Sequence, residues 1–109
     1  MSGTNTGARV KSEAIRELAF GAVPAVLTQI GPVVAFTLKS LRFVNTTDVD
    51  IYFSIYAGLN NIRLAAYSAF TFDLQTNNMT MVDGDPILVS YTSMGAPTLG
   101  NVWVETYYT

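Results

Sequence analysis

Short segments in which apolar and polar side chains alternate are the feature that most limits what this chain can fold into. Two segments show the pattern throughout: in residues 50–57, Ile51, Phe53 and Ile55 alternate with Tyr52, Ser54 and Tyr56, and in residues 101–108, Val102, Val104 and Thr106 alternate with Trp103, Glu105 and Tyr107. A period of two places successive side chains on opposite faces of a strand, and the strand-favouring residues Thr, Val, Ile, Phe and Tyr are common from Val33 onward. The pattern predicts strands with one aliphatic face and one aromatic and polar face.

Turn sequences separate these segments at short, regular intervals. We expect strands at about 33–44, 50–57, 61–65, 69–74, 79–82, 87–93 and 101–108. The intervening loops are too short for a crossover helix, so the strands are expected to pair in antiparallel fashion. The sequence therefore predicts an all-β fold, an antiparallel β-sandwich of jelly-roll-like or immunoglobulin-like type.

The N-terminal end differs from the rest of the chain. Residues 1–12 are polar and predict a flexible, extended N-terminal arm, which leaves residues 13–109 as a single β-sandwich domain. Residues 12–19 fit a short helix that is capped by Ser12, with Ile15 and Leu18 on one side.

An uncharged stretch of 21 residues lies between Glu17 and Lys39 and is long enough to suggest a membrane-spanning helix. Pro24 and the Gly31-Pro32 pair interrupt it, because proline lacks a backbone donor and both residue types favour turns. We therefore expect extended segments here and no membrane partner. The stretch follows 17 largely polar residues, which is not the arrangement of a signal peptide.

Charged side chains are scarce. The chain is 50% hydrophobic, with six basic and eight acidic residues among 109, whereas soluble surfaces usually carry about 25–35% charged residues. Residues 1–43 hold five Lys or Arg and two Glu, while residues 44–109 hold one Arg and six acidic residues. This asymmetry can steer the basic end of one subunit toward the acidic part of another, although scattered solvated charges are the simpler interpretation. We expect part of the surface to be covered in a homo-oligomer.

Catalytic and metal-binding residue types are largely missing. The chain has no histidine and no cysteine, which removes the usual general base, the thiol nucleophile and the commonest zinc ligands. Two carboxylate pairs, Asp48 with Asp50 and Asp83 with Asp85, are better explained by turn preference than by calcium binding. We expect no enzyme activity, no cofactor and no metal, and the acidic net charge argues against a nucleic-acid partner.

Outward-facing aromatic residues are the candidate contact surface. If the aliphatic sets face the core, then Tyr52, Tyr56, Trp103 and Tyr107 face outward, where large aromatic side chains are typical of protein contacts. With Arg9 and Lys11 of the arm, they form the predicted subunit interface. The opposite assignment of the inner and outer faces stays open from the sequence.

Several short strings also resemble one group of proteins. They are Phe20-Gly21, Ile30-Gly31-Pro32, residues 43–48 (FVNTTD), residues 52–54 (YFS), residues 72–74 (FDL) before Asn77, and residues 96–105 (APTLGNVWVE). Together they are similar to small virion structural proteins of tailed bacteriophages, over about residues 20–108. The sequence departs from that pattern at Tyr56-Ala57-Gly58, where an acidic-glycine turn is expected.

The resemblance implies a β-sandwich present in many copies on a virion. Such a protein would act as a capsid cement or decoration protein, or as a head, neck or tail component, with other virion proteins as its partners. The residues independently suggest the same role, because the loose N-terminal arm could become ordered on a neighbouring subunit. The alternative from the residues is a carbohydrate- or receptor-binding module, in which Tyr52, Tyr56, Trp103 and Tyr107 would stack on sugar faces.

Overall fold

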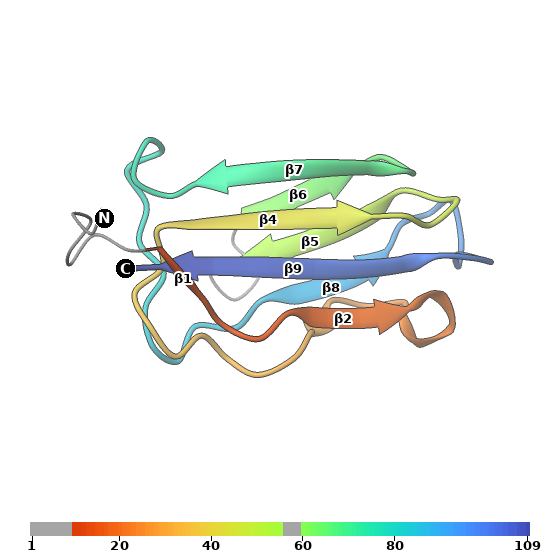
Figure 1. Ribbon diagram of the computed structural model, residues 1–109. Coiled ribbons are helices and arrows are strands. Elements are labelled where there is room, and N and C mark those ends of the chain that lie inside the picture. The colour runs from red at the N-terminus through yellow and green to blue at the C-terminus, as the bar shows by residue number, and fades with distance from the viewer. Residues whose placement is uncertain (1–9, 56–59) are drawn as a thin grey trace, which may run out of the picture.

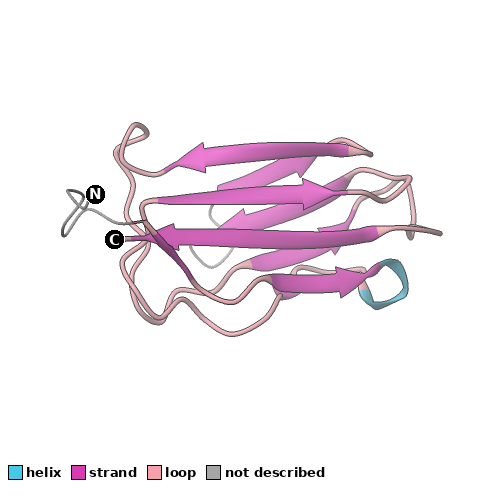
Figure 2. Ribbon diagram, viewed as in Figure 1, coloured by secondary structure: helices cyan, strands magenta, loops and turns pink. Residues whose placement is uncertain are grey.

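The computed structural model describes residues 10–55 and 60–109. Its elements are β1 (Lys11–Ser12), β2 (Arg16–Ala19), the 3-10 turn η2 (Phe20–Ala22), β3 (Thr28–Gln29), β4 (Ser40–Asn45), β5 (Ile51–Ile55), β6 (Asn60–Leu64), β7 (Ser68–Asp73), β8 (Leu88–Tyr91) and β9 (Asn101–Tyr108). The expected all-β class is confirmed (Figure 2).

Two antiparallel sheets face each other (Figure 1). The front sheet has the order β1-β9-β4-β7, with β2 also pairing with β9, and the back sheet has the order β3-β8-β5-β6. Side chains of the two inner faces interdigitate, as in other sandwiches. Phe43 of β4 and Phe53 of β5 meet across the sheets with ring centroids 4.9 Å apart, and both side chains are fully buried.

The pairing of the strands is nested. β2 pairs with β9, β3 with β8, β4 with β7, and β5 with β6, so the chain follows the path of one long hairpin. The pairs β4–β9 and β5–β8 then close that hairpin into two sheets of a rolled sandwich. This is the jelly-roll arrangement. The immunoglobulin-like alternative requires the first two strands to be neighbours in one sheet, which the observed order excludes.

The short helix expected at residues 12–19 is wrong, because this segment is extended. Its residues contribute to β1 and β2, which both pair with β9, because that strand offers a long edge to which extended backbone can hydrogen-bond. Ile15 is 59% exposed whereas Arg16 is buried, so the proposed apolar helix face does not exist. Lys11 and Ser12 also belong to the sheet, which moves the start of the domain into the expected arm; residues 1–9 lie outside the described part.

Two strand expectations differ from the structure. Residues 79–82 form no strand, and the segment expected at 33–44 becomes a strand from Ser40. Residues 30–39 instead run along the rim between the sheets, where the backbone N–H groups of Ile30, Val34 and Leu38 donate to carbonyls of residues 81–87. These isolated hydrogen bonds satisfy the backbone while the apolar side chains of this segment are buried, without the continuous hydrogen-bond ladder of a strand. The strands expected at 50–57, 61–65, 69–74, 87–93 and 101–108 are present within two residues at each end.

Candidate functional site

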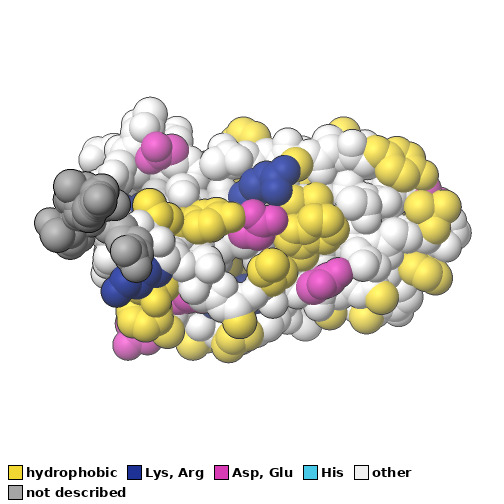
Figure 3. Space-filling view, in the orientation of Figure 1, with side chains coloured by type: hydrophobic (Ala, Val, Ile, Leu, Met, Phe, Trp, Pro, Cys, Tyr) yellow, Lys and Arg dark blue, Asp and Glu magenta, His cyan; other side chains and the backbone are white. Residues whose placement is uncertain are grey.

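The outer face of the front sheet carries part of the predicted contact surface. Along β9, Val102, Val104 and Thr106 are fully buried and the alternate side chains are half-buried on the outer face. Trp103 and Tyr107 therefore point outward, in agreement with the alternation in the sequence. In Figure 3 a broad hydrophobic area lies beside one basic and one acidic group near the middle of this face.

Glu105 is the centre of a polar cluster on this outer face. Its carboxylate accepts hydrogen bonds from the Tyr107 hydroxyl, from Trp103 Nε1 at 2.9 Å and from an Arg42 guanidinium nitrogen at 3.3 Å. Beside it lies a shallow cavity of about 290 Å³ that is lined by Ile15, Glu17, Trp103 and Glu105. The hydrogen bond from Trp103 Nε1 thus orients the indole toward Glu105.

The hydrogen bonds also change the proton affinities in this cluster. Those from Tyr107 and then Trp103 stabilise the carboxylate and outweigh its partial burial, so the pKa of Glu105 is lowered below its ordinary value. The Tyr107 hydroxyl donates to a negative group, which raises the pKa of Tyr107 above its ordinary value.

We expect the fluorescence of Trp103 to report protonation of Glu105. Trp103 is the single tryptophan of the chain, and its indole loses a charged acceptor when Glu105 is protonated. Because the folded-state pKa of Glu105 is lowered, the stabilisation is present at neutral pH and is lost as pH falls through that value. A fluorescence titration of the native protein should have its midpoint below pH 4.5. The Glu105→Gln variant should lack this transition, and a midpoint above pH 4.5 in the unmodified protein would contradict the assignment.

Tyr52 lies on the opposite side of the molecule. It belongs to β5 of the back sheet, where Ile51, Phe53 and Ile55 fill the core and Tyr52 faces outward. The Arg63 guanidinium lies 5.7 Å from the centre of its ring and bridges to Asp50, with Nε 2.9 Å from the carboxylate. Tyr52 and Trp103 therefore belong to two separate surfaces, because β5 and β9 lie in different sheets.

The remaining predicted interface residues are only partly placed. Lys11 is exposed on β1 and pairs with Tyr108 at the edge of the front sheet. Arg9 and Tyr56 lie outside the described residues. The structure thus brings Trp103 and Tyr107 together, with Lys11 on an adjoining edge strand, and separates Tyr52 from them.

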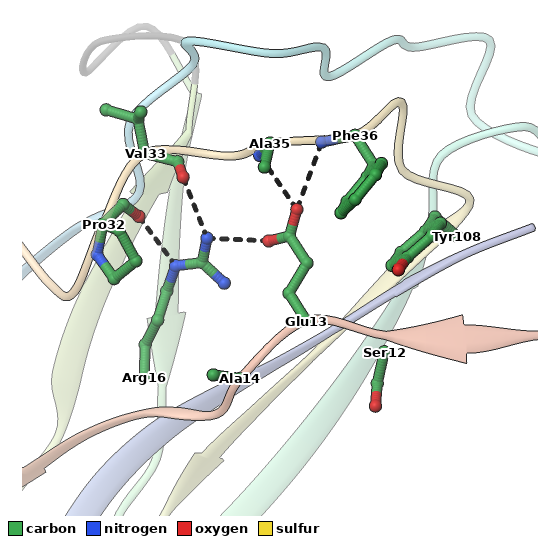
Figure 4. A pocket seen from close by; sticks show the side chains of 9 residues that line it. All are labelled: Ser12, Glu13, Ala14, Arg16, Pro32, Val33, Ala35, Phe36 and Tyr108. Atoms are coloured by element: carbon green, nitrogen blue, oxygen red, sulfur yellow. Dashed lines mark hydrogen bonds and ion pairs between the residues drawn. The ribbon is translucent and has the colours of Figure 1, made fainter.

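A buried ion pair next to β2 escaped the sequence analysis (Figure 4). Arg16 and Glu13 are 2.7 Å apart, and their side chains are 1% and 8% exposed. The Arg16 guanidinium also donates to the carbonyl oxygens of Pro32 and Val33 and to the Thr106 hydroxyl. No spacing signal in the sequence marks this pair, because its other partners are backbone atoms 16–23 residues away and the hydroxyl of Thr106, about 90 residues away.

Both carboxylate oxygens of Glu13 accept hydrogen bonds in the same arrangement. Its second carboxylate oxygen accepts hydrogen bonds from the backbone N–H groups of Ala35 and Phe36, at 2.9 and 3.2 Å. Burial opposes the charged form, but the bond from Ala35 and the interactions with Arg16 and Thr106 outweigh it, and the pKa of Glu13 is lowered. The pair therefore acts as a clamp that fastens residues 32–36 to the front sheet.

A cavity of about 350 Å³ opens beside this clamp. Its walls are mainly apolar and include Val33 and the rings of Phe36 and Tyr108, which stack with centroids 4.1 Å apart. The charged groups at its base are Glu13 and Arg16, and both direct their hydrogen bonds to protein atoms. The cavity thus offers an apolar recess without an available charged group.

Three of the four carboxylates in the two acidic pairs accept hydrogen bonds from the protein itself. Asp48 accepts hydrogen bonds from the Thr98 backbone and hydroxyl, Asp50 accepts from Arg63, and Asp85 accepts from the Val82 backbone. Among the described residues, no group of three Asp, Glu, His or Cys side chains is placed to hold a metal ion.

Exposed apolar side chains also gather on the loops at the right-hand end of Figure 1. Phe20, Tyr67, Met94 and Leu99 are 42–66% exposed. Backbone hydrogen bonds from Phe20 to Gly100, from Thr46 to Asn101 and from Tyr67 to Thr47 connect the segments at this end. Hydrophobic side chains are visible at this end of the molecule in Figure 3.

Comparison of the chain with protein-family models, with curated proteins and with solved structures found no match. Within the part of the chain that the structure describes, no helix has the length and apolar character needed to cross a membrane.

Proposed function

We propose that this chain is a non-enzymatic structural protein of a bacteriophage virion. It assembles in many copies through subunit contacts, as a capsid cement or decoration protein or as a head, neck or tail component. The observation that carries the proposal is the nested strand pairing of a single jelly roll, an architecture that viral capsid domains use. The fold alone does not assign a function, so the surface must support the same conclusion.

The surface supports an assembling protein because apolar side chains are exposed in several separate places. Among residues 10–55 and 60–109, twelve large hydrophobic residues are at least 37% exposed: Val10, Ile15, Phe20, Val26, Leu27, Val33, Phe36, Tyr67, Phe70, Val82, Met94 and Leu99. Single exposed apolar residues are ordinary, but extended apolar areas usually mark contacts. Their spread over both ends and the front edge favours contacts with several neighbours.

The polar groups support the proposal in a second way. The carboxylates of Glu13, Glu105, Asp48 and Asp50 accept hydrogen bonds from the protein itself. These bonds fix loops and outer-face side chains in place, and a rigid surface loses less conformational entropy when it assembles.

The proposal is tested on particles from cells that carry the gene. Particles purified through a density gradient are digested, and peptides of this chain are quantified against those of the major particle protein. We expect many copies per particle. A particle fraction that lacks these peptides would overturn the proposal, and binding of the purified protein to a glycan array would instead favour the carbohydrate-binding alternative.

We expect Trp103→Ala and Tyr52→Ala to affect assembly differently. Both side chains face outward, but Trp103 lies beside the cavity of the front sheet, whereas Tyr52 packs against Arg63 on the back sheet. Loss of a central aromatic anchor commonly costs about 2 kcal/mol or more of binding free energy. The Trp103→Ala variant should fold, as judged by circular dichroism, but should be absent from the particle fraction.

Tyr52→Ala is the matched control for this experiment and should remain with the particles. Equal retention of the two variants would show that the outer face of the front sheet is not the contact. Loss of both would mean that the two faces are used together.

A further inference from the structure

The free edge of the front sheet is formed by β7. No strand of residues 10–55 or 60–109 lies beyond it, and Figure 1 shows it along the upper margin of the molecule. Its sequence, Ser-Ala-Phe-Thr-Phe-Asp, has no lysine, proline or glycine and belongs to a six-residue strand. Natural proteins usually protect such edges with charges, proline, bulges or very short strands, and β7 has one charge at its last residue.

The other edges are shorter or better protected. β3 has two residues, and β1 and β2 have two and four. The clamp of Glu13 and Arg16 fastens residues 32–36 beside them. β6 carries Arg63. β7 is therefore the longest described edge without a blocking feature.

The backbone groups that face this edge can be identified. The N–H of Thr46 donates to the carbonyl of Asn101, and backbone groups of successive residues point to opposite sides of a strand. In β4, residues 41, 43 and 45 therefore point toward β7. Their partners in the observed register are Phe72, Phe70 and Ser68, which leaves the N–H and C=O groups of Ala69 and Thr71 directed away from the sheet.

We propose that β7 pairs in antiparallel fashion with β7 of a second copy of this chain, around a two-fold axis at Thr71. The two front sheets then form one continuous sheet across the dimer. A second copy fits because an antiparallel edge is self-complementary: Thr71 presents one donor and one acceptor to Thr71 of the copy. Ala69 faces Asp73 of the copy, whose carbonyl oxygen also accepts hydrogen bonds from Asn77 of its own chain.

The side chains agree with this register. Thr71 meets Thr71 of the copy, a favourable cross-strand pair, and Asp73 meets Ala69, so the two acidic groups stay apart. On the inner face, Phe70 meets Phe72 twice. Phe70 is 44% exposed and Phe72 is partly buried against the core, so the pairing would cover the apolar part of the edge.

This inference rests on the proposed function in one respect, that copies of the chain associate. It adds which surface makes the contact and that the partner is a second copy. A pair of six-residue strands buries less area than a standard stable interface of about 1,200–2,000 Å². The isolated dimer is therefore weak and gains from the many simultaneous contacts of an assembly.

Single cysteines test the axis, because the natural chain has none. Thr71→Cys places two cysteines opposite each other at the axis. The Cα atoms of such a hydrogen-bonded pair are about 5.5 Å apart, which is within the roughly 4.4–6.8 Å that a disulfide spans. Ala69→Cys is the matched control: it is exposed on the same face but its two copies are about 13 Å apart along the strand. Mild oxidation should cross-link Thr71→Cys to a dimer much faster than Ala69→Cys. Equal rates, or no cross-linking of Thr71→Cys, would overturn the proposal.

A backbone variant tests the hydrogen bonds. Thr71→Pro removes an outward N–H, which an edge strand tolerates, and should weaken the dimer at least about tenfold in sedimentation equilibrium, through lost bonds and ring clash. Thr71→Val keeps the backbone and should dimerise normally. If both variants keep the affinity of the unmodified chain, the edge is not the contact.

These outcomes separate this inference from the proposed function. Cross-linking at Thr71 in a protein that is absent from particles would support the edge contact and overturn the virion role. Many copies on particles without cross-linking at Thr71 would overturn the edge contact alone.

Discussion

Replacing Glu13 with alanine is expected to lower the free energy of unfolding by about 3–5 kcal/mol. The substitution leaves the Arg16 guanidinium, whose side chain is 1% exposed, without its ionic partner. It also removes the acceptor for the backbone N–H groups of Ala35 and Phe36. Since small domains are stable by about 5–15 kcal/mol, the variant should lose a large share of its stability. Urea unfolding at neutral pH measures the loss.

Three comparisons test the cause of that loss. Glu17→Ala, which removes an exposed carboxylate that accepts a bond from Asn101, should cost less than about 1 kcal/mol. The double variant with Arg16→Met should recover part of the stability, because no unpaired charge remains. In acid the single variant should approach the unmodified protein: the pKa of Glu13 is lowered in the folded state, so its stabilisation is lost as pH falls through that value. A cost below about 1 kcal/mol at neutral pH would show that the clamp is unimportant.

Replacing Phe53 with alanine is also expected to cost about 3–5 kcal/mol. Its side chain is fully buried and packs against Phe43, so truncation leaves a cavity between the two sheets. The matched control is Phe70→Ala, because Phe70 is 44% exposed at the sheet edge and should cost much less in dilute solution. Urea unfolding followed by circular dichroism compares the two. If Phe70→Ala were the more destabilising of the pair, the assignment of the core would be wrong.

The strands that the sequence predicted well are those whose environment is uniform along their length. β5 and β9 each have one face of fully buried side chains, whereas the other face is half-buried in β9 and carries the half-buried Tyr52 and the buried but polar Ser54 in β5. The alternation of residue types is therefore complete in both strands. β2 was mistaken for a helix because a four-residue strand is too short to show a period, and because its buried position is occupied by Arg16. Residues 79–82 have strand-like composition, but their backbone bonds go to turns and loops.

The positions of the predicted interface residues could be inferred only in part, for a related reason. Alternation correctly placed Tyr52 and Trp103 on the outward sides of their strands. It could not show that these strands lie in different sheets, since that depends on which segments pair. The predicted single interface therefore separates into two surfaces, and the subunit contact itself stays a prediction.

The sequence by itself determined the fold class, the orientation of the two best strands and the shortage of catalytic residue types, because each follows from local periodicity or from composition. The tertiary structure decided the jelly-roll order, the Glu13–Arg16 clamp, the cluster around Glu105 and the free edge at β7. Each of these depends on contacts between residues far apart in the chain: Arg16 meets Thr106 across 90 positions. Such pairings are set by the packing of two sheets around one core, and no local pattern records them.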